Sequence, residues 1–363
     1  MTGKTSQPFS RVHIVGTGLL GTSLGLALRE RGVEVTLEDV SPSSLSLAED
    51  YGAGVRSSPE QGEPELVVVA TPPDVVASVV VEVLGKYSHA LVIDVASVKA
   101  QITRDVQAHS AHFARFVPSH PMAGRERGGA VSGRSDLFTA RPWVLCAPES
   151  EAREAIRAFV VSLGALPIEM SPDDHDNAVA IVSHIPQLVA SLTAARLQDA
   201  SDEALDLAGT GVRDVTRIAQ SDPALWIQIL SANAHPLVEH LTSLRDDLDE
   251  VLRALGSLDA SGSRKVLAEA LGAGVNGVSR LPGKHGTSTA FASLVVVIDD
   301  SPGELARLLT QLGEWGVNLE DLRLEHSPGA QVGFADLTLT PDVVADVEKQ
   351  LREAGWRIAG ERS

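Results

Sequence analysis

A glycine-rich turn between a strand and a helix constrains the fold of this chain more strongly than any other feature. Residues 11–39 read RVHIVGTGLLGTSLGLALRERGVEVTLED. Their hydrophobic pattern predicts a strand over 12–15, a helix from about 19 to 31 and a second strand over 33–38. The turn between the first strand and the helix spells G-x-G-x-x-G, a sequence that is typical of dinucleotide-binding βαβ units in this context.

Each glycine of the turn has a mechanical task in such a site. Gly16 permits the sharp turn, Gly18 lets a pyrophosphate approach the backbone, and Gly21 lets the helix pack closely on the strand. The unpaired N–H groups at the helix start, at Leu19 and Leu20, are expected to face the phosphates, where the helix dipole favours negative charge. A plain strand–helix turn is the alternative interpretation.

An acidic residue at the end of the second strand indicates which dinucleotide is bound. Asp39 is the better candidate for the ribose hydroxyls, and Glu38 is the competitor one residue earlier. A carboxylate there would repel the extra phosphate of NADP, and no Arg or Lys follows at 40–42 to reverse that effect. The sequence therefore predicts NAD as the cofactor.

Composition excludes several classes of partner. The 363 residues suffice for two or three domains, and the formal net charge of −18 would repel nucleic acid and anionic membrane surfaces. The longest apolar runs have the length of strands, and the N-terminus lacks the apolar core of a signal peptide. The single cysteine, Cys146, lies in an apolar run and is expected to be buried. We therefore expect a cytoplasmic protein that binds a small molecule, without nucleic-acid or membrane partners.

The first part of the chain predicts a Rossmann-type, doubly wound α/β domain over residues 10–170. A continuous apolar run at 66–70 is expected for a strand buried on both faces of a parallel sheet; a second apolar run follows at 90–95, and a shorter strand is expected at 116–117. Two further predicted strands, at 141–147 and 166–170, close this domain. Ligands bind outside the carboxyl ends of such strands, where Thr71, Ser97 and His120 follow the three runs. We expect these side chains to gather at one edge, with Thr71 and Ser97 beside the dinucleotide.

The remaining chain predicts an all-helical domain over 171–286 and a small α+β domain over 287–363. Helical apolar spacing begins after residue 171, and residues 256–286, which are rich in Gly, Ser and Ala, are expected to form a partly helical connector. The last domain has predicted strands at 292–298, 318–325, 331–340 and 356–359, and predicted helices at 304–315 and 343–354. This βαββαβ order is the split βαβ plan of small regulatory modules.

His120 is the candidate general base. It follows a strand and precedes a proline in a glycine-containing loop, and a histidine titrates near neutral pH. Ser97 and Lys99 could orient this base or contact a ligand. The alternatives are a structural loop histidine, a helix N-cap at Ser97 and a solvated lysine at Lys99. We expect no metal site, since the histidines lack metal-ligand spacing and His109 and His112 lie on a polar stretch.

Arg213 and Arg217 are candidates for binding a carboxylate. They are four residues apart and share one helical face if the helix begins early enough. The guanidinium fork suits carboxylates, although pairing with Asp214 or Asp222 is the alternative. His184 precedes a Pro within a long apolar helix, where a buried structural histidine is as well supported as a ligand contact.

Five segments together resemble the prephenate dehydrogenase family. In chain order they are G-x-G-x-x-G at 16–21, Asp-x-x-Ser-Val-Lys at 94–99, His-Pro-Met-x-Gly at 120–124, Val-Ser-His-Ile-Pro at 182–186 and Arg-Asp-Val-Thr-Arg-Ile-Ala-x-Ser-Asp-Pro at 213–223. The resemblance runs in order over residues 11–255. The tail from Ala292, with Asp-Ser-Pro-Gly-Glu-Leu at 300–305, is similar to ACT domains, which bind amino acids.

This resemblance implies oxidative decarboxylation of prephenate to 4-hydroxyphenylpyruvate, in tyrosine synthesis, with NAD as the hydride acceptor. It implies that His120 accepts the proton of the ring hydroxyl and that Ser97 forms a hydrogen bond near it. It further implies that Arg217 holds a substrate carboxylate and that His184 lies in the substrate pocket, with Arg213 nearby. Loss of carbon dioxide aromatises the ring, which makes the step effectively irreversible.

Several alternatives stay open. Arogenate, which carries an amine where prephenate has a ketone, is the closest alternative substrate, and Arg125 could bear on that choice. Homoserine and hydroxyacid dehydrogenases also join a nucleotide domain to an ACT-like one, but they lack the His120 loop followed by the 213–223 stretch. A non-catalytic NAD-sensing regulator is a remoter alternative. We also expect L-tyrosine to act as an effector at the ACT-like domain, and a homodimer built by helix packing.

Overall fold

Residues 7–124, 128–282, 291–326 and 332–362 are described by the computed structural model. The chain divides into two units, residues 1–200 with 215–244, and residues 201–214 with 245–363. The domain boundaries expected at 170 and 286 stay predictions. Arg125 and the turn expected at 327–329 lie outside the described residues.

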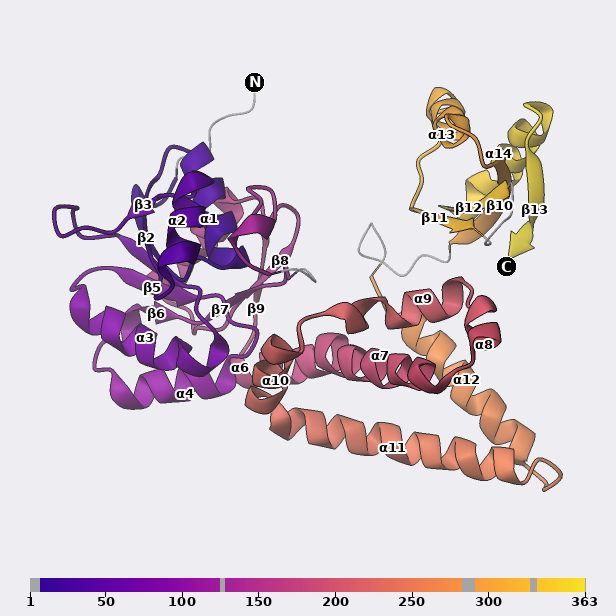
Figure 1. Cartoon of the computed structure of the whole chain (residues 1–363), viewed down its shortest axis with the longest axis horizontal. Helices are drawn as coiled ribbons and strands as arrows, with labels where there is room; N and C mark the ends of the chain where they lie inside the picture. The colour runs from indigo at the N-terminus through magenta and orange to yellow at the C-terminus, as the bar shows by residue number, and fades with distance from the viewer. Residues whose placement is uncertain (1–6, 125–127, 283–290, 327–331, 363) are drawn as a thin grey trace. The chain divides into compact units, whose positions relative to one another are not determined.

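A six-stranded parallel sheet forms the centre of the first unit (Figure 1). The strands are β1 (Arg11–Val15), β2 (Glu34–Glu38), β3 (Val55–Arg56), β4 (Leu66–Val69), β5 (Leu91–Asp94) and β6 (Phe116–Val117). Their order is β3-β2-β1-β4-β5-β6, and neighbouring strands pair in parallel. The order reverses between β1 and β4, so the loops that follow these two strands border the crevice in which such sheets bind ligands.

Helices cover both faces of this sheet. They are α1 (Leu19–Glu30), α2 (Pro42–Asp50), α3 (Pro73–Lys86), α4 (Ala100–His109) and α5 (Glu151–Ser162). Leu66 and Val68 of β4 belong to the core that contains α1, α2 and α5. Val67 and Val69 belong to a second core with α3 and α4. Because successive residues of one strand are buried on opposite faces, the predicted doubly wound α/β domain is confirmed.

A separate three-stranded sheet corrects one expectation about this domain. It contains β7 (Ser119–Pro121), β8 (Pro142–Leu145) and β9 (Leu166–Glu169), in the order β7-β8-β9. The predicted strands near 141–147 and 166–170 therefore exist but do not extend the parallel sheet. His120 was expected in a loop, whereas it lies in β7 and pairs with Val144 of antiparallel β8. A short 3₁₀ turn, η1 (Phe113–Arg115), precedes β6, and a second one, η2 (Ala130–Ser132), lies between β7 and β8.

The helical segment after β9 contains a π turn. It comprises α6 (Pro172–Val179), the π segment η3 (Ala180–His184), α7 (Ile185–Ala195) and the 3₁₀ turn η4 (Arg196–Asp199). Pro186 cannot donate a backbone hydrogen bond within a helix, and wider turns of this kind accommodate such a break. By length and composition alone residues 172–199 could cross a membrane, since they have a mean hydropathy of 1.5 over the most apolar window.

Further helices follow in the expected region. They are α8 (Asp202–Asp206), α9 (Thr210–Thr216), the 3₁₀ turn η5 (Arg217–Gln220), α10 (Pro223–Ala232), α11 (Ala234–Gly256) and α12 (Ser263–Ser279). Most of the expected connector is therefore the regular helix α12. Within the described part of 171–282 the structure contains no strand, so the predicted all-helical segment is confirmed.

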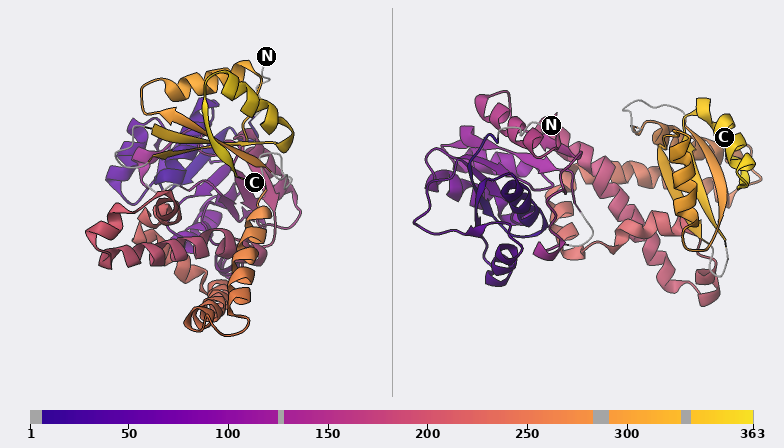
Figure 2. Two further views of the ribbon diagram at one scale, coloured as in Figure 1. Left: turned by 90° about the vertical axis from the view of Figure 1, so that its right-hand side faces the viewer. Right: turned by 90° about the horizontal axis from the view of Figure 1, so that it is seen from above.

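The C-terminal part of the second unit has the expected βαββαβ order. Its elements are β10 (Ala292–Asp299), α13 (Glu304–Glu314), β11 (Asp321–His326), β12 (Val332–Leu339), α14 (Pro341–Glu353) and β13 (Arg357–Arg362). The antiparallel sheet has the order β11-β12-β10-β13. Alternate residues of β10 and β12 form one core with both helices, which therefore lie on the same face of the sheet (Figure 2).

Candidate active site

The glycine-rich turn after β1 is shaped by close backbone packing. A Cβ atom at Gly16 would lie 2.5 Å from the carbonyl oxygen of Ala70, and the φ of Gly16 is +100°. A Cβ atom at Gly21 would lie 1.9 Å from the carbonyl oxygen of Gly16. A Cβ atom at Gly18 would meet nothing within 4 Å. The chain itself therefore requires glycine at 16 and 21, whereas Gly18 borders open space at the N-terminus of α1, where Leu19 and Leu20 are half-buried.

Asp39 is tied to the same turn. Its Oδ2 accepts hydrogen bonds from the backbone N–H and the hydroxyl of Thr17, at 2.6 and 2.8 Å, and its Oδ1 accepts from the N–H of Ser41 at 2.8 Å. A carboxylate offers about four acceptor positions, so Asp39 retains capacity for a further donor. Glu38 instead contacts His13 and Lys86, at 3.3 and 3.7 Å. Of the two expected candidates, the structure places Asp39 at the glycine-rich turn.

Two polar residues follow the next strands. The hydroxyl of Thr71, after β4, is buried and has no hydrogen-bond partner within the described residues. Buried hydroxyls normally have a partner, so this one fits a site that a ligand completes. Ser97, after β5, is half-buried and does not cap α4, whose N-cap residue is Lys99 and has no side-chain cap bond. The N-cap alternative for Ser97 is therefore wrong.

Lys99 is not the solvated lysine that the alternative interpretation predicted. Its side chain and that of Asp94 are both 0% exposed, and the ammonium group pairs directly with Asp94 Oδ2. Asp94 Oδ1 also accepts from the N–H of Ser119, at 3.1 Å, and the Ser119 hydroxyl donates to the carbonyl of Asp94 at 2.6 Å. A buried ion pair thus joins the end of β5 to the strand that carries His120.

His120 belongs to a chain of buried hydrogen bonds. Its Nδ1 lies 2.8 Å from Nε2 of His175, and Nδ1 of His175 lies 2.8 Å from Oδ1 of Asp176. The Asp176 carboxylate also accepts from the backbone N–H groups of Lys99 and Ala100, at 2.7 and 2.8 Å. The rings of His120 and His175 pack edge to face, with centroids 5.1 Å apart. The described residues contain no group of three or more His, Cys, Asp or Glu suited to a metal.

His184 is held by a second branch of the same network. Asn233 Nδ2 donates to the backbone carbonyl of Asp176 at 2.8 Å and lies 3.0 Å from His184 Nδ1. Because the carbonyl can only accept, the amide nitrogen is the atom that faces both partners, and His184 Nδ1 must accept. The proton of the neutral ring is then on Nε2. Trp226 packs edge to face on this ring, with centroids 5.9 Å apart.

Burial keeps both site histidines neutral. It lowers the pKa of His120 well below 6.5, and the nearby His175, Lys99 and His184 lower it further. Burial also lowers the pKa of His184 to about 4, although the carboxylate of Asp176 acts in the opposite direction. A neutral imidazole at pH 7 can accept a proton, so His120 has the protonation state of a general base.

The two arginines are placed less favourably than their spacing suggested. The α-helix α9 ends at Thr216, and Arg217 begins the 3₁₀ turn η5, so the expected shared α-helical face does not form. Both side chains are exposed, and Arg213 and Arg217 belong to different units. Cys146 is buried as expected, and burial raises the pKa of its thiol to about 12. His109 and His112 are exposed, also as expected.

Sequence reasoning missed His175, Asp176 and Asn233. Asp176 was passed over as part of a helix start, because three aspartates follow Pro172 within four residues. Its partners in α4 lie 76 and 77 residues earlier, and Asn233 lies 57 residues later. The one local signal was a histidine next to an aspartate on a helix that also carries His184.

Comparison with known proteins identifies the family. Models of the nucleotide-binding domain and the dimerization domain of prephenate dehydrogenase match residues 24–165 and 171–271. A probable prephenate dehydrogenase of Streptomyces niveus, NovF, is 36% identical over 354 residues, which cover 94% of this chain and 98% of that protein. The prephenate dehydrogenase of Bacillus subtilis is 25% identical over 331 residues, 86% of this chain and 87% of that protein.

Solved structures agree with this assignment. Synechocystis arogenate dehydrogenase is 25% identical, with a TM-score of 0.61 over 73% of this chain and 99% of that chain. A prephenate dehydrogenase of A. aeolicus, in complex with hydroxyphenyl propionate and NAD+, is 26% identical, with a TM-score of 0.64 over 74% of this chain and 98% of that chain. The chain therefore belongs to the prephenate dehydrogenase family.

Proposed function

We propose that this NAD-dependent oxidoreductase converts prephenate to 4-hydroxyphenylpyruvate, with loss of carbon dioxide, in tyrosine synthesis. The observation that carries this proposal is the buried His120, which lies in β7 just after β6, the last strand of the parallel sheet that also presents the glycine-rich turn. The related A. aeolicus enzyme binds NAD+ and hydroxyphenyl propionate, a phenol with a carboxylate side chain, which supports the same chemistry here.

The proposed NAD site lies around the N-terminus of α1. The open space at Gly18 and the N–H groups of Leu19, Leu20 and Gly21 suit a pyrophosphate. Asp39 is proposed to accept from the ribose hydroxyls, and the Thr71 hydroxyl and Ser97 to border the cofactor. When bound, NAD supplies the hydride acceptor; the chain's own residues bind the substrate, orient it and take its proton.

The proposed chemical role of His120 is general base catalysis. It takes the proton of the ring hydroxyl while hydride leaves the same ring carbon. The carbon–carbon bond to the ring carboxylate then breaks, its electron pair enters the ring, and the ring oxygen recovers a proton as the phenol forms. Ser97 is proposed to position this hydroxyl, and Arg217, Arg213 and the Nε2–H of His184 to bind the substrate, as the family resemblance implies.

A homodimer is also proposed. Residues 171–271 match the family's dimerization domain, and only 28% of the apolar window in 172–199 is buried within this chain. The exposed apolar side chains include Ile181, Val182 and Leu192, which are 50%, 63% and 64% exposed. Packing against a second copy would remove this apolar surface from water. A cytoplasmic location without a membrane partner stays a prediction.

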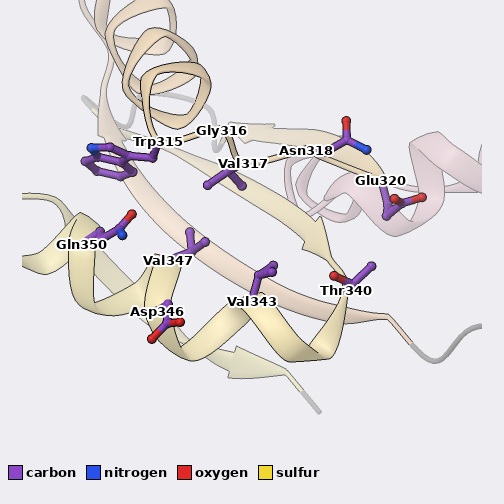
Figure 3. Close-up of a pocket in the computed structure, with 10 residues that line it drawn as sticks. All are labelled: Trp315, Gly316, Val317, Asn318, Glu320, Thr340, Val343, Asp346, Val347 and Gln350. Atoms are coloured by element: carbon purple, nitrogen blue, oxygen red, sulfur yellow. The ribbon is translucent and has the colours of Figure 1, made fainter.

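The C-terminal part is proposed to be an ACT-like regulatory domain with L-tyrosine as its effector. A cavity of about 360 Å³ lies between the segment after α13 and the helix α14 (Figure 3). Val317, Val343 and Val347 provide apolar lining, and the carboxylates of Glu320 and Asp346 could attract an ammonium group. An aromatic amino acid combines these features, and the turn at 300–305 that resembles ACT domains belongs to the same domain.

The deciding assay measures NAD reduction by the purified full-length protein. Prephenate and arogenate are offered separately, and L-tyrosine is added afterwards. We expect turnover of prephenate and a lower rate with tyrosine. Turnover of arogenate alone would leave the assignments of the base and the fold in place, with arogenate as the substrate instead of prephenate. Binding of NAD without turnover of either compound would contradict the enzymatic proposal, and an unchanged rate and thermal stability with tyrosine would contradict the effector.

A single methyl group tests the NAD site. Gly18→Ala adds a Cβ that meets no atom of the chain within 4 Å, so stability should be unchanged. If the pyrophosphate occupies this space, the affinity for NAD should fall about tenfold or more, which is about 1.4 kcal/mol or more. The matched control is Gly85→Ala, an exposed helical glycine of α3 with equally open surroundings. Equal NAD affinities of the two variants in a binding titration would place the pyrophosphate elsewhere.

A further inference from the structure

The hydrogen-bond chain behind His120 ends on a carboxylate, and this determines where each proton lies. Asp176 Oδ1 can only accept when ionised, so Nδ1 of His175 donates to it. A ring that carries its single proton on Nδ1 has a lone pair on Nε2, so Nε2 of His175 accepts from Nδ1–H of His120. The unprotonated nitrogen of His120 is consequently Nε2, the one atom of the ring left for the substrate.

From this geometry we propose that His175 and Asp176 are positioning residues of the reaction. They hold His120 in the tautomer whose Nε2 accepts the substrate proton, and they stabilise the imidazolium that forms. An aspartate performs this task directly on the histidine of Ser-His-Asp triads, whereas here a second histidine stands between base and carboxylate. The kinetic part of this proposal rests on the proposed function; the assignment of the tautomer does not.

The position of Asp176 is fixed, and this fixes the direction of the hydrogen bonds from His120 through His175 to Asp176. Two backbone N–H groups at the start of α4, those of Lys99 and Ala100, bind its two oxygens. A helix N-terminus favours a negative charge at this place. Asp176 is 5% exposed and His175 is 0% exposed, so water does not compete for these bonds.

The surroundings of His120 oppose a positive charge on its ring. Burial lowers the pKa of His120 most, and His175, Lys99 and His184 act in the same direction. Asp94 neutralises Lys99 through their buried ion pair. Asp176 provides negative charge through His175, so the protonated ring is stabilised from the side opposite the substrate.

A purely structural role is the competing explanation, because Asp176 also joins α6 to α4. The structural role and the positioning role can be distinguished by replacing His120, the proposed base. If His175 acts through His120, its replacement should matter only while His120 is present, since residues that act as a unit give non-additive losses. A residue that merely supports the fold would lower activity, stability or both in either background.

The experiment compares His175→Phe and His175→Gln in the wild-type and His120→Asn backgrounds. His175→Phe removes the acceptor of the Nδ1 proton and should lower kcat by about 10- to 100-fold, with an unchanged KM for NAD. His175→Gln can accept that proton through its amide oxygen and should recover part of the loss. In the His120→Asn background both substitutions of His175 should leave kcat nearly unchanged. Asp173→Asn is the control, because this carboxylate lies on the same helix and its side chain is 78% exposed.

Nitrogen-15 NMR of the histidine rings gives a readout that does not need turnover. The signals of His120 are those absent from His120→Asn, and at pH 7 they should show protonated Nδ1 and unprotonated Nε2. The His175→Phe variant should lose this preference. A protonated Nε2 in the wild type, or equal kinetic losses in both backgrounds, would overturn the proposal. If neither prephenate nor arogenate is turned over, the proposed function fails and the NMR result alone decides the tautomer.

Discussion

Replacing His120 with Asn should lower kcat by a factor of about 10²–10⁴, the usual contribution of a positioned general base. Asparagine keeps a polar group of similar reach but cannot accept a proton at neutral pH. Folding and NAD affinity should be retained, because His120 lies on the short strand β7 rather than in the glycine-rich turn. Steady-state NAD reduction with saturating substrate measures the loss.

The pH dependence of kcat is expected to follow the protonation of His120. Its neutral form is the active one, and burial lowers its pKa well below 6.5. The value of kcat should therefore stay level as the pH falls through 6.5 and decline only at a lower pH.

The control for the His120→Asn substitution is His109→Asn, since the ring of His109 is exposed and bonds only to a backbone carbonyl among the described residues. A His120→Asn variant that kept more than about a tenth of the wild-type kcat would rule out the base.

Separating the buried pair of Asp94 and Lys99 should produce the largest loss of stability. Asp94→Asn leaves the Lys99 ammonium group unpaired at 0% exposure, and breaking such a pair costs about 3–5 kcal/mol of unfolding free energy. Lys99→Met should be similarly harmful, because it leaves the carboxylate without its counter-ion. Urea denaturation of each variant, followed by a signal from the first unit, measures the change.

A double variant and a surface pair control this measurement. Asp94→Asn combined with Lys99→Met leaves no unpaired charge and should recover part of the lost stability. Asp173→Asn breaks the exposed pair with Arg104, whose side chains are 78% and 57% exposed, and should change stability by less than about 1 kcal/mol. If the single variants at 94 and 99 cost no more than this surface variant, the ion pair is not a stabilising element of the site.

The sequence predicted those features whose cause is local. Glycine is required at 16 and 21 by backbone atoms a few residues or one strand away, so the motif alone located the turn. The buried strands could be predicted for the same reason, since β4 is apolar throughout and β5 is apolar up to its last residue, Asp94. The βαββαβ order was likewise evident from alternating patterns within short segments.

What the sequence could not show depends on contacts between distant segments. His120 was expected in a loop because β7 has only three residues and exists through pairing with β8. Lys99 reads as a surface lysine until Asp94 is seen folded against it. The roles of His175 and Asn233 arise only when α6 and the residue between α10 and α11 meet at Asp176.

The π turn at 180–184 has a consequence for how the helix presents its two histidines. His175 and His184 are nine residues apart, which is about two and a half turns of a regular α-helix and would direct them to opposite sides. A wider turn between them lags behind the α-helical rotation and reduces this offset. Both rings can then reach the network that Asn233 and Asp176 connect. The irregular turn thus acts as an angular spacer: deleting one residue from it would leave a helix intact while rotating His184 away from its partner.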